Sequence, residues 1–360
     1  MALHPISAQE AMQRMALPQG TSGAFSCIID ARSESEHAHD HLPDALNWPS
    51  LTDEERVRVG TIYKQVSAFE ANKVGAALVA ANIAKHLEQH VMQLPKTWQP
   101  LLYCWRGGKR SGSLALVLGQ IGFKVWLIEG GYKAFRAAVV EATSSMATAL
   151  NFQVIAGPTG SGKTRLLHAL AQAGAQVLDL EALAQHRSSV LGRIPGQAQP
   201  SQKHFDMRIW QQLCQFDASR TVFVEAESKK VGNVSIPEEL VQAMRNSPCI
   251  DLQLNDDERV KLLLEDYAFF AQDAELFCQR LQVLTPLKGK TVVSDWQGLV
   301  HAGQTEQVVR DLLLTHYDPT YAKSVARNFL HFGQAHVLHL PSRQEQDMQH
   351  AARELSQRYP

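Results

Sequence analysis

The N-terminal half of the chain is organised around one stretch, Cys104-Trp105-Arg106-Gly107-Gly108-Lys109-Arg110-Ser111. It follows an apolar run, residues 101–103, and precedes residues 113–118, whose pattern predicts a buried helix. A strand that turns directly into a helix points loop N–H groups at one spot, beside the positive end of the helix dipole. A thiol at that spot should ionise easily, because those groups favour the thiolate. The stretch therefore predicts an anion-binding loop with a nucleophilic sulfur at its mouth.

Glycines and cations in the same stretch suit it to an anion. Two glycines let the backbone curl without steric cost, and three basic residues add positive charge. A lone cysteine in a strand is usually a core residue, but five residues between the cysteine and an arginine, in a strand–loop–helix setting, favour a reactive one. Two protein classes have such a loop, rhodanese-type sulfurtransferases and Cys-X5-Arg phosphatases. We therefore expect catalytic roles for Cys104, Arg106, Lys109 and Arg110, and supporting roles in the loop for Trp105, Gly107, Gly108 and Ser111.

Length and composition limit the remaining possibilities. A chain of 360 residues predicts two domains, and a net charge of −1 gives no global sign of nucleic-acid binding, so any RNA contact must come from local patches. The 5 cysteines are widely spaced without a Cys-X-X-Cys pair, which fits a reducing cytoplasm and argues against a disulfide framework or a zinc site. Neither a secretory signal nor a membrane-length apolar run is visible. We expect a soluble cytoplasmic protein.

Strands alternate with helices in the first half of the chain. Apolar runs predict strands over residues 25–29, 101–104 and 124–128, and helical spacing covers 68–91 and 132–140. This alternation predicts a parallel sheet covered on both faces. Asp30 and Arg32, at the end of the first of these strands, are expected to pair locally with loop backbone. The histidines at 37, 39 and 41 alternate in a polar loop, and we expect them to face solvent and not a metal.

A second loop opens the other half of the chain. An apolar strand, residues 152–156, runs into Gly157-Pro158-Thr159-Gly160-Ser161-Gly162-Lys163-Thr164 and then into a helical segment, 165–173. This is the Gly-X4-Gly-Lys-Thr pattern of a P-loop in its strand–loop–helix setting. Backbone N–H groups wrap a phosphate, the lysine meets its outer oxygens, and the threonine hydroxyl can hold Mg²⁺. The pattern leaves open whether the ligand is a nucleotide or another diphosphate. The expected diphosphate-binding residues here are Gly157, Gly160, Ser161, Gly162, Lys163 and Thr164.

Acidic residues end the next two predicted strands of this half. Asp179 follows residues 176–178 and Glu225 closes 221–225, and strand-end carboxylates in such a domain face the phosphate site. For Glu227 and the two lysines that follow it, a solvated loop is an equal alternative. The basic insert 186–205, with Arg187, Arg193, Pro195, Gln199, Pro200 and Lys203, fits either a loop that closes over a polyanion or a solvated surface.

Helical patterns dominate the C-terminal part of the chain. They cover residues 258–270, 276–284 and 306–317, and predict a helical lobe beside the P-loop sheet. Residues 317–321 predict a turn, and a strand over 335–340 and a polar helix close the chain. Residues 142–150 predict a linker or a helix end. We therefore expect an α/β protein with two domains, a parallel-sheet domain over 1–145 and a P-loop NTPase-like domain with a helical lobe over 146–360.

Further residues of the first half carry a family resemblance. The Asp-Ala-Arg strand end (30–32), His-Leu-Pro-Asp-Ala-Leu-Asn (41–47), the cysteine loop and Glu-Gly-Gly-Tyr-Lys-Ala-Phe (129–135) together resemble the rhodanese domain. Joined to the P-loop, they closely resemble the tRNA 2-selenouridine synthase family over nearly the entire chain. Residues 59–64, 179–187 and 317–321 agree with this family. It usually has Glu-Asp-Glu-Ser where this chain has Glu-Ala-Glu-Ser (225–228).

The resemblance implies a transferase that acts on tRNA with 2-thiouridine at the wobble position. Geranyl diphosphate would alkylate the sulfur, and selenophosphate would then supply selenium while the S-geranyl group leaves, giving 2-selenouridine. Cys104 would carry selenium as an S-selanyl intermediate, the cysteine loop would bind selenophosphate, and the P-loop would hold the diphosphate, with Mg²⁺ at Thr164. The implied partners are tRNA and the enzyme that produces selenophosphate, without a membrane.

Two other functional classes stay open at this point. A sulfurtransferase or a Cys-X5-Arg phosphatase fused to a nucleotide-binding module would share both loops. The phosphatase fusion would hydrolyse a generic aryl phosphate and would not bind tRNA. A nucleotide-switched sulfur carrier would instead need a protein acceptor, and RNA that co-purifies with the chain would argue against it.

Overall fold

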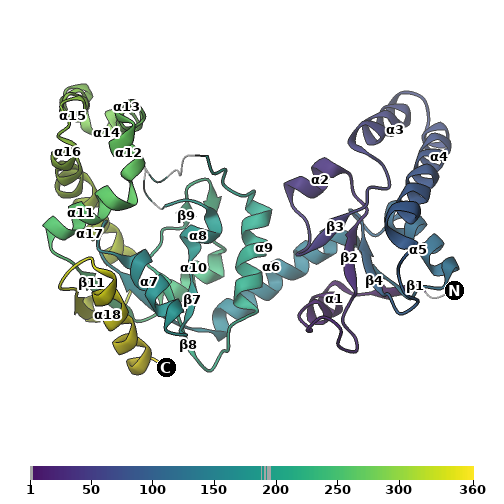
Figure 1. The fold of residues 1–360 in the computed structure, drawn as a ribbon, viewed down its shortest axis with the longest axis horizontal. Helices are drawn as coiled ribbons and strands as arrows, with labels where there is room; N and C mark the ends of the chain where they lie inside the picture. The colour runs from purple at the N-terminus through teal and green to yellow at the C-terminus, as the bar shows by residue number, and fades with distance from the viewer. Residues whose placement is uncertain (1–2, 188, 190–191, 193–195) are drawn as a thin grey trace. The chain divides into compact units, whose positions relative to one another are not determined.

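The computed structural model describes residues 3–187, 189, 192 and 196–360. The chain forms two compact units (Figure 1), the first made of residues 1–142 with 201–210, the second of 143–200 with 211–360. The predicted domain limit at residue 145 stays a prediction. The two units are described one after the other.

A five-stranded parallel sheet forms the centre of the first unit. Its strand order is β1-β5-β4-β2-β3, and all its neighbouring strands run parallel. The strands are short and largely apolar, as expected for a sheet covered on both faces. Their bounds are β1 Leu3–Ile6, β2 Cys27–Asp30, β3 Ala45–Asn47, β4 Pro100–Tyr103 and β5 Val125–Ile128.

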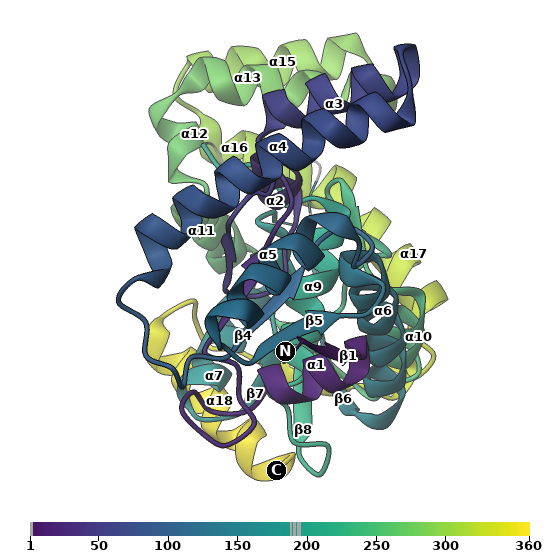
Figure 2. The ribbon, with the colours of Figure 1, turned by 90° about the vertical axis from the view of Figure 1, so that its right-hand side faces the viewer.

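Helices pack around this sheet. Helix α5 covers it by packing Leu114 and Leu118 against Ile29 and Leu102 of the strands. Helices α3 and α4 lie side by side as a pair (Figure 2), and the side chains of Thr52 and Ser67 cap their first turns. The helix bounds are α1 Ala8–Met15, α2 Glu34–His39, α3 Asp53–Gln65, α4 Ala68–His86 with a π-turn at Leu87–Val91, α5 Lys109–Ile121 and α6 Gly131–Ala149.

The second unit has its own five-stranded parallel sheet. The order is β12-β11-β6-β8-β7, with β6 in the middle, so the loop that follows β6 emerges at the centre of the sheet edge. A short antiparallel hairpin, β9 and β10, lies apart from it. The strands are β6 Asn151–Ala156, β7 Gln176–Leu178, β8 Thr221–Glu225, β9 Lys230–Val231, β10 Val234–Ser235, β11 Cys249–Gln253 and β12 His336–His339.

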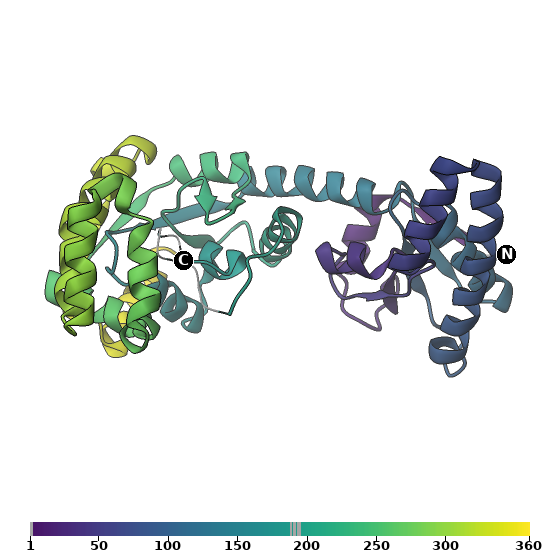
Figure 3. The ribbon, with the colours of Figure 1, turned by 90° about the horizontal axis from the view of Figure 1, so that it is seen from above.

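A helical lobe with a core of its own belongs to this unit. Phe277, Leu281, Trp296 and Leu312 are buried members of that core, and the lobe helices run side by side (green in Figure 3). Helix α18 instead packs on α7 over the sheet. The helices of this half are α7 Lys163–Gln172, α8 Leu180–Ala184, α9 Gln202–Leu213, α10 Glu238–Arg245, α11 Asp256–Asp266, α12 Ala268–Gln272, α13 Ala274–Gln282, α14 Thr285–Lys288, α15 Lys290–His301, α16 Thr305–Leu312, a π-turn at Leu313–Tyr317, α17 Asp318–Asn328, a 3-10 turn at Phe332–Gln334 and α18 Glu345–Arg358.

The predicted α/β class, with two parallel sheets and a helical lobe, is confirmed. The predicted turn over residues 317–321 is wrong, because the π-turn ends at Tyr317 and α17 begins at Asp318. Pro319 lies in the first turn of α17, where a missing backbone N–H costs nothing. Residues 142–149 continue α6, so this stretch is a helix end. None of the described helices combines the length and apolarity needed to cross a bilayer.

One buried cation ties the helical lobe to the P-loop. Arg259 of α11 is 4% exposed, and its guanidinium donates at 2.8 and 3.0 Å to the carbonyl oxygen of Thr159 in the loop. It also pairs with Asp318 at 2.6 Å and with Asp256 at 2.8 Å. This guanidinium therefore joins the start of α11, the start of α17 and the phosphate loop.

Replacement of Arg259 by Met should destabilise the second unit by about 3 kcal/mol, because it leaves a carbonyl and a carboxylate without their partner. For a unit of this size that corresponds to a melting temperature lowered by roughly 6–12 °C. Calorimetry of the full chain measures it. Arg310→Met is the matched control, since Arg310 pairs with exposed acids on α16 and α11 and should cost less than about 1 kcal/mol. Equal losses in both variants would contradict the anchoring role.

Candidate active sites

Cys104 lies directly after β4, and α5 begins five residues later, so the predicted strand–loop–helix setting is present. The residue is 3% exposed. Its Sγ accepts a hydrogen bond from the N–H of Gly108 at 3.2 Å. A backbone donor thus faces the sulfur from the loop that closes over it.

The Gly-Gly-Tyr segment at the start of α6 holds this loop through backbone hydrogen bonds. The N–H of Tyr132 donates to the Cys104 carbonyl at 2.8 Å, and that of Lys133 donates to the Trp105 carbonyl at 3.1 Å. Gly131 has φ +59°, and a Cβ there would overlap the Cys104 carbonyl oxygen. Gly107 has φ +65°, and a Cβ there would approach the Ile128 carbonyl oxygen to 2.7 Å. Both glycines are therefore required by close backbone packing around the sulfur.

The basic residues of the loop have different surroundings. Arg110 forms an ion pair with Glu36 at 2.6 Å, and Lys109 donates to the amide oxygen of Asn72 at 3.2 Å, whereas Arg106 is exposed. Burial would raise the pKa of Glu36, but the hydrogen bond and charge of Arg110, the Ser33 amide and the charge of Arg56 together outweigh it and hold the pKa below its usual value. Ser111 is fully buried, and its hydroxyl has no hydrogen-bond partner among the described atoms.

One cation of this site comes from far along the sequence. Residues 201–210, at the start of α9, belong to the first unit. Lys203 holds its ammonium 5.2 Å from the ring centre of Trp105 and 5.7 Å from that of Tyr132. Asp206 pairs with Arg136 of α6 at 2.7 Å and fixes this segment. Lys203 thus lies next to Trp105, the residue that follows the cysteine. The sequence analysis did not predict this contact, because it placed Lys203 in a loop of the second half.

Asp30 and Arg32 have the structural role that the sequence favoured. Arg32 is 1% exposed, and its guanidinium donates hydrogen bonds to the carboxylate of Asp30 and to the carbonyl of Asp40. The same guanidinium lies 4.0 Å from the ring centre of Tyr132. Burial would raise the pKa of Asp30, but hydrogen bonds from His37 and Arg32 outweigh it and lower the pKa. Within the described residues, no histidine joins a group with metal-binding geometry.

The P-loop connects β6 to α7 with its glycines in the expected positions. Gly160 and Gly162 have φ of +79° and +90°, in the left-handed region. The Gly157 N–H donates to the Tyr321 hydroxyl at 2.5 Å. Lys163 donates to the Gly157 carbonyl at 2.9 Å, and the buried Ser161 hydroxyl has no partner among the described atoms. The loop therefore places a lysine and a hydroxyl at the start of a helix.

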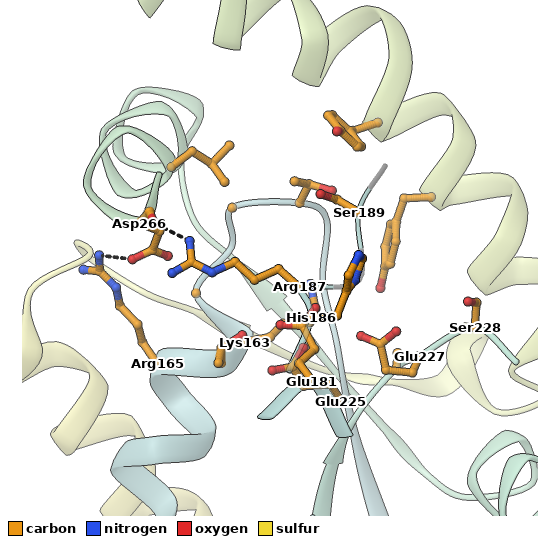
Figure 4. A pocket seen from close by; sticks show the side chains of 18 of the residues that line it. Lys163, Arg165, Glu181, His186, Arg187, Ser189, Glu225, Glu227, Ser228 and Asp266 are labelled. Atoms are coloured by element: carbon orange, nitrogen blue, oxygen red, sulfur yellow. Dashed lines mark hydrogen bonds and ion pairs between the residues drawn. The ribbon is translucent and has the colours of Figure 1, made fainter. Parts of the chain in front are cut away.

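This loop forms one wall of a cavity of about 890 Å³ (Figure 4). Three carboxylates lie together in it, Glu181, Glu225 and Glu227, with one oxygen of each within 4.8 Å of the others. Glu225 is 3% exposed, and one of its oxygens has no hydrogen-bond partner among the described atoms. Burial raises the pKa of Glu225 well above its ordinary value, the charge of Glu181 raises it further, and the Lys163 ammonium offsets part of this.

Comparisons with known proteins match both halves. A model of the rhodanese-like domain matches residues 7–138, and one of the tRNA 2-selenouridine synthase AAA domain matches 150–289. The tRNA 2-selenouridine synthase of Nitrosomonas europaea is 36% identical over 269 residues, which are 74% of this chain and 69% of that protein. That of Pseudomonas syringae pv. syringae is 30% identical over 324 residues, 82% of this chain and 87% of that protein. The chain belongs to the tRNA 2-selenouridine synthase family.

The expected family is confirmed by these matches. A third relative, from Aeromonas salmonicida, is 34% identical over 243 residues, which are 67% of this chain and 64% of that protein. The matched regions thus span about two thirds or more of the length of these synthases. The two matched domains are the two expected from the cysteine loop and the P-loop.

Within this synthase fold, the predicted P-loop acids have unequal surroundings. Asp179 lines the cavity but caps α8 through the Ala182 N–H at 2.8 Å and lies 3.2 Å from His168. Glu227, for which a solvated loop was an equal alternative, is 7% exposed and lies beside Glu225. The sequence analysis did not predict Glu181 as a residue of this site. For Glu227 the spacing from Glu225 indicated that both side chains would lie on the same side, because residues two apart along a strand do so.

The basic insert of the synthase is only partly described. Arg187 lines the P-loop cavity and donates to the carbonyl of Asp266 (Figure 4), whereas Lys203 belongs to the first unit. The predicted residues Arg193 and Pro195 lie outside the described residues. Lys229 pairs with Glu238 on the exposed surface.

The three carboxylates of the cavity fit a hard divalent cation. Mg²⁺ prefers oxygen ligands and usually combines one or two protein carboxylates with phosphate oxygens. Glu225 has a buried oxygen without a partner among the described atoms, so a cation there would satisfy it. Together with the Thr164 hydroxyl at the start of α7, this donor set is compatible with Mg²⁺ at the phosphate site.

Glu225→Gln should change how stability depends on pH. The raised pKa means that the folded chain retains a proton that the unfolded chain releases near the ordinary value of 4.5. This contribution is present in full below that value and is lost as pH rises through the raised pKa. The variant should therefore melt higher than the wild type near pH 8, with the gap shrinking towards about pH 4. Differential scanning fluorimetry measures both, and a gap independent of pH would contradict the burial argument.

Proposed function

We propose that this chain converts wobble 2-thiouridine of tRNA into 2-selenouridine in the cytoplasm, in two steps on two loops. The observation that supports the proposal is the presence of two strand–loop–helix turns of different chemistry in one chain. One directs a backbone N–H at the sulfur of Cys104, and the other presents Lys163 beside a cavity with three carboxylates. Family membership supplies tRNA as the substrate, because the relatives are named for it.

The first proposed step is S-alkylation with geranyl diphosphate at the P-loop. The sulfur of 2-thiouridine forms a bond to C1 of the geranyl group, the C1–O bond to the diphosphate breaks, and the base loses its N3 proton. Charge develops on the departing diphosphate, where Lys163 and the amides at the start of α7 can stabilise it. Mg²⁺ held by Thr164 and by carboxylates of the cavity would neutralise the same oxygens.

The second proposed step exchanges S-geranyl for selenium from selenophosphate. Alkylated sulfur leaves as a neutral thiol, so the barrier to substitution at C2 falls. A C2–Se bond forms, the C2–S bond breaks with geranyl thiol leaving, and water takes the phosphoryl group as phosphate. Selenium stays at the selenide level throughout, so no external oxidant or reductant is needed. The S-selanyl form of Cys104 that the family resemblance implies would need a two-electron oxidant, so the proposed step does not pass through it and Cys104 acts by binding the donor. We assign capture of the selenium end of the donor to Cys104 and its loop, with Lys203 and the free Ser111 hydroxyl near the phosphoryl oxygens.

Two partners follow from this proposal. The tRNA must bring one base to both loops in turn, and the enzyme that produces selenophosphate must supply the donor.

Cys104→Ala should stop selenium incorporation while S-geranyl-2-thiouridine accumulates. The variant removes the sulfur from one loop and leaves the other loop intact. Mass analysis of nucleosides from 2-thiouridine tRNA incubated with geranyl diphosphate, selenophosphate or both measures each step separately. Cys214→Ala is the control, since Cys214 is an exposed cysteine outside both loops. Loss of geranylation with selenium transfer intact would reverse the assigned roles.

Lys163→Ala should block the first step, with geranylation slowed by about 100-fold or more, because a donor to the departing oxyanion is lost. Supplied with pre-geranylated tRNA, this variant should still incorporate selenium. Lys261→Ala serves as the control, since Lys261 is an exposed lysine of α11 that pairs with Glu258. Normal geranylation by the Lys163 variant would remove the P-loop from the mechanism.

A further inference from the structure

A small apolar pocket opens beside the P-loop, inside the helical lobe. Its volume is about 50 Å³. Most of its wall is aliphatic or aromatic, formed by Leu263, Phe270, Phe277, Val309, Leu312 and Leu313. Phe270 and Phe277 stack with ring centres 4.7 Å apart, so one side of the pocket is a rigid aromatic surface.

The pocket adjoins the large cavity that the P-loop lines. Thr159, which belongs to the P-loop itself, lines both this pocket and the large cavity. Leu263, Tyr267 and Tyr317 also line both. A ligand whose phosphate is held at the start of α7 can therefore extend an apolar end into the lobe.

Size and chemistry argue against a nucleobase as the occupant of this pocket. A water molecule needs roughly 10–15 Å³ on the same measure, so 50 Å³ holds about three to five non-hydrogen atoms. A purine has about twice that number and presents polar edges, which would lose hydrogen bonds in an apolar pocket. One branched five-carbon unit matches both the volume and the apolar wall.

We propose that this pocket receives the terminal isoprene unit of a prenyl diphosphate held by the P-loop, and thereby selects a ten-carbon chain. The inference rests on the proposed function. The first isoprene unit of such a ligand lies next to the diphosphate, in the large cavity, and the second reaches the pocket. A five-carbon chain leaves the pocket unused. A fifteen-carbon chain meets Phe277 and Leu312, which are 1% and 3% exposed and belong to the lobe core.

Val309 is the position at which this idea is best tested. It lies at the edge of the lobe core and is only half-buried, so its side chain can change without opening the core. Val309→Phe fills the pocket, and Val309→Ala widens it. Val292→Phe is the matched control, because Val292 is 38% exposed on α15 and lines neither cavity.

The experiment measures the affinity of the full chain for four probes: dimethylallyl, geranyl and farnesyl diphosphate, and inorganic diphosphate. The wild type should bind geranyl diphosphate at least ~10-fold more tightly than dimethylallyl diphosphate, because several more carbons are buried. Val309→Phe should abolish that gap and leave inorganic diphosphate binding unchanged. Val309→Ala should raise farnesyl diphosphate affinity about threefold or more, and Val292→Phe should behave as the wild type.

The outcomes separate this inference from the function on which it rests. If the wild type prefers geranyl diphosphate and both Val309 variants keep the wild-type order of chain lengths, the pocket does not hold the chain, and only this inference is overturned. If the wild type binds geranyl diphosphate no better than inorganic diphosphate and does not geranylate tRNA, the proposed function and the inference both fail.

Discussion

The cysteine loop and the P-loop depend on the same backbone constraint, a parallel strand that turns into a helix within a few residues. β4 leads to α5 around Cys104, and β6 leads to α7 around Lys163. Such a turn needs residues in the left-handed region and close approach of the backbone, which is why Gly107 and Gly162 have positive φ. In return, N–H groups and the helix dipole face one point. What differs is the added group, a sulfur in one loop and an ammonium in the other.

The charge balance of the P-loop cavity follows from this constraint. The loop concentrates positive potential, and the cavity opposes it with Glu181, Glu225 and Glu227. Burial of Glu225 is costly for a carboxylate, so the site favours either a proton or a cation at that position. The charge of Arg259 does not offset that of the three glutamates, because its guanidinium is already bound by Asp256, Asp318 and a loop carbonyl. Lys163 is the cation whose charge offsets part of the rise in the pKa of Glu225.

Local features of the sequence predicted both loops, since each depends on neighbours within about ten residues. Cys104 and Lys163 could be found in this way, with the strand before and the helix after. Contacts between distant segments could not: Tyr321 reaches the Gly157 amide from 164 positions away. Glu181 was missed because only the strand-end positions were considered. The prediction of a turn over 317–321 was wrong because proline is common both in turns and in the first turn of a helix.

Lys203 shows most clearly that sequence pattern alone does not reveal a contact between distant segments. Its neighbours in sequence belong to the P-loop half, and the family model for that half covers it, yet residues 201–210 pack in the first unit. The ion pair between Asp206 and Arg136 and the contact of Trp210 with Phe135 hold this segment against α6. A fragment ending near residue 145 would keep Cys104 and its loop but lose the cation beside Trp105. The surroundings of the cysteine loop are therefore built from two separated parts of the sequence.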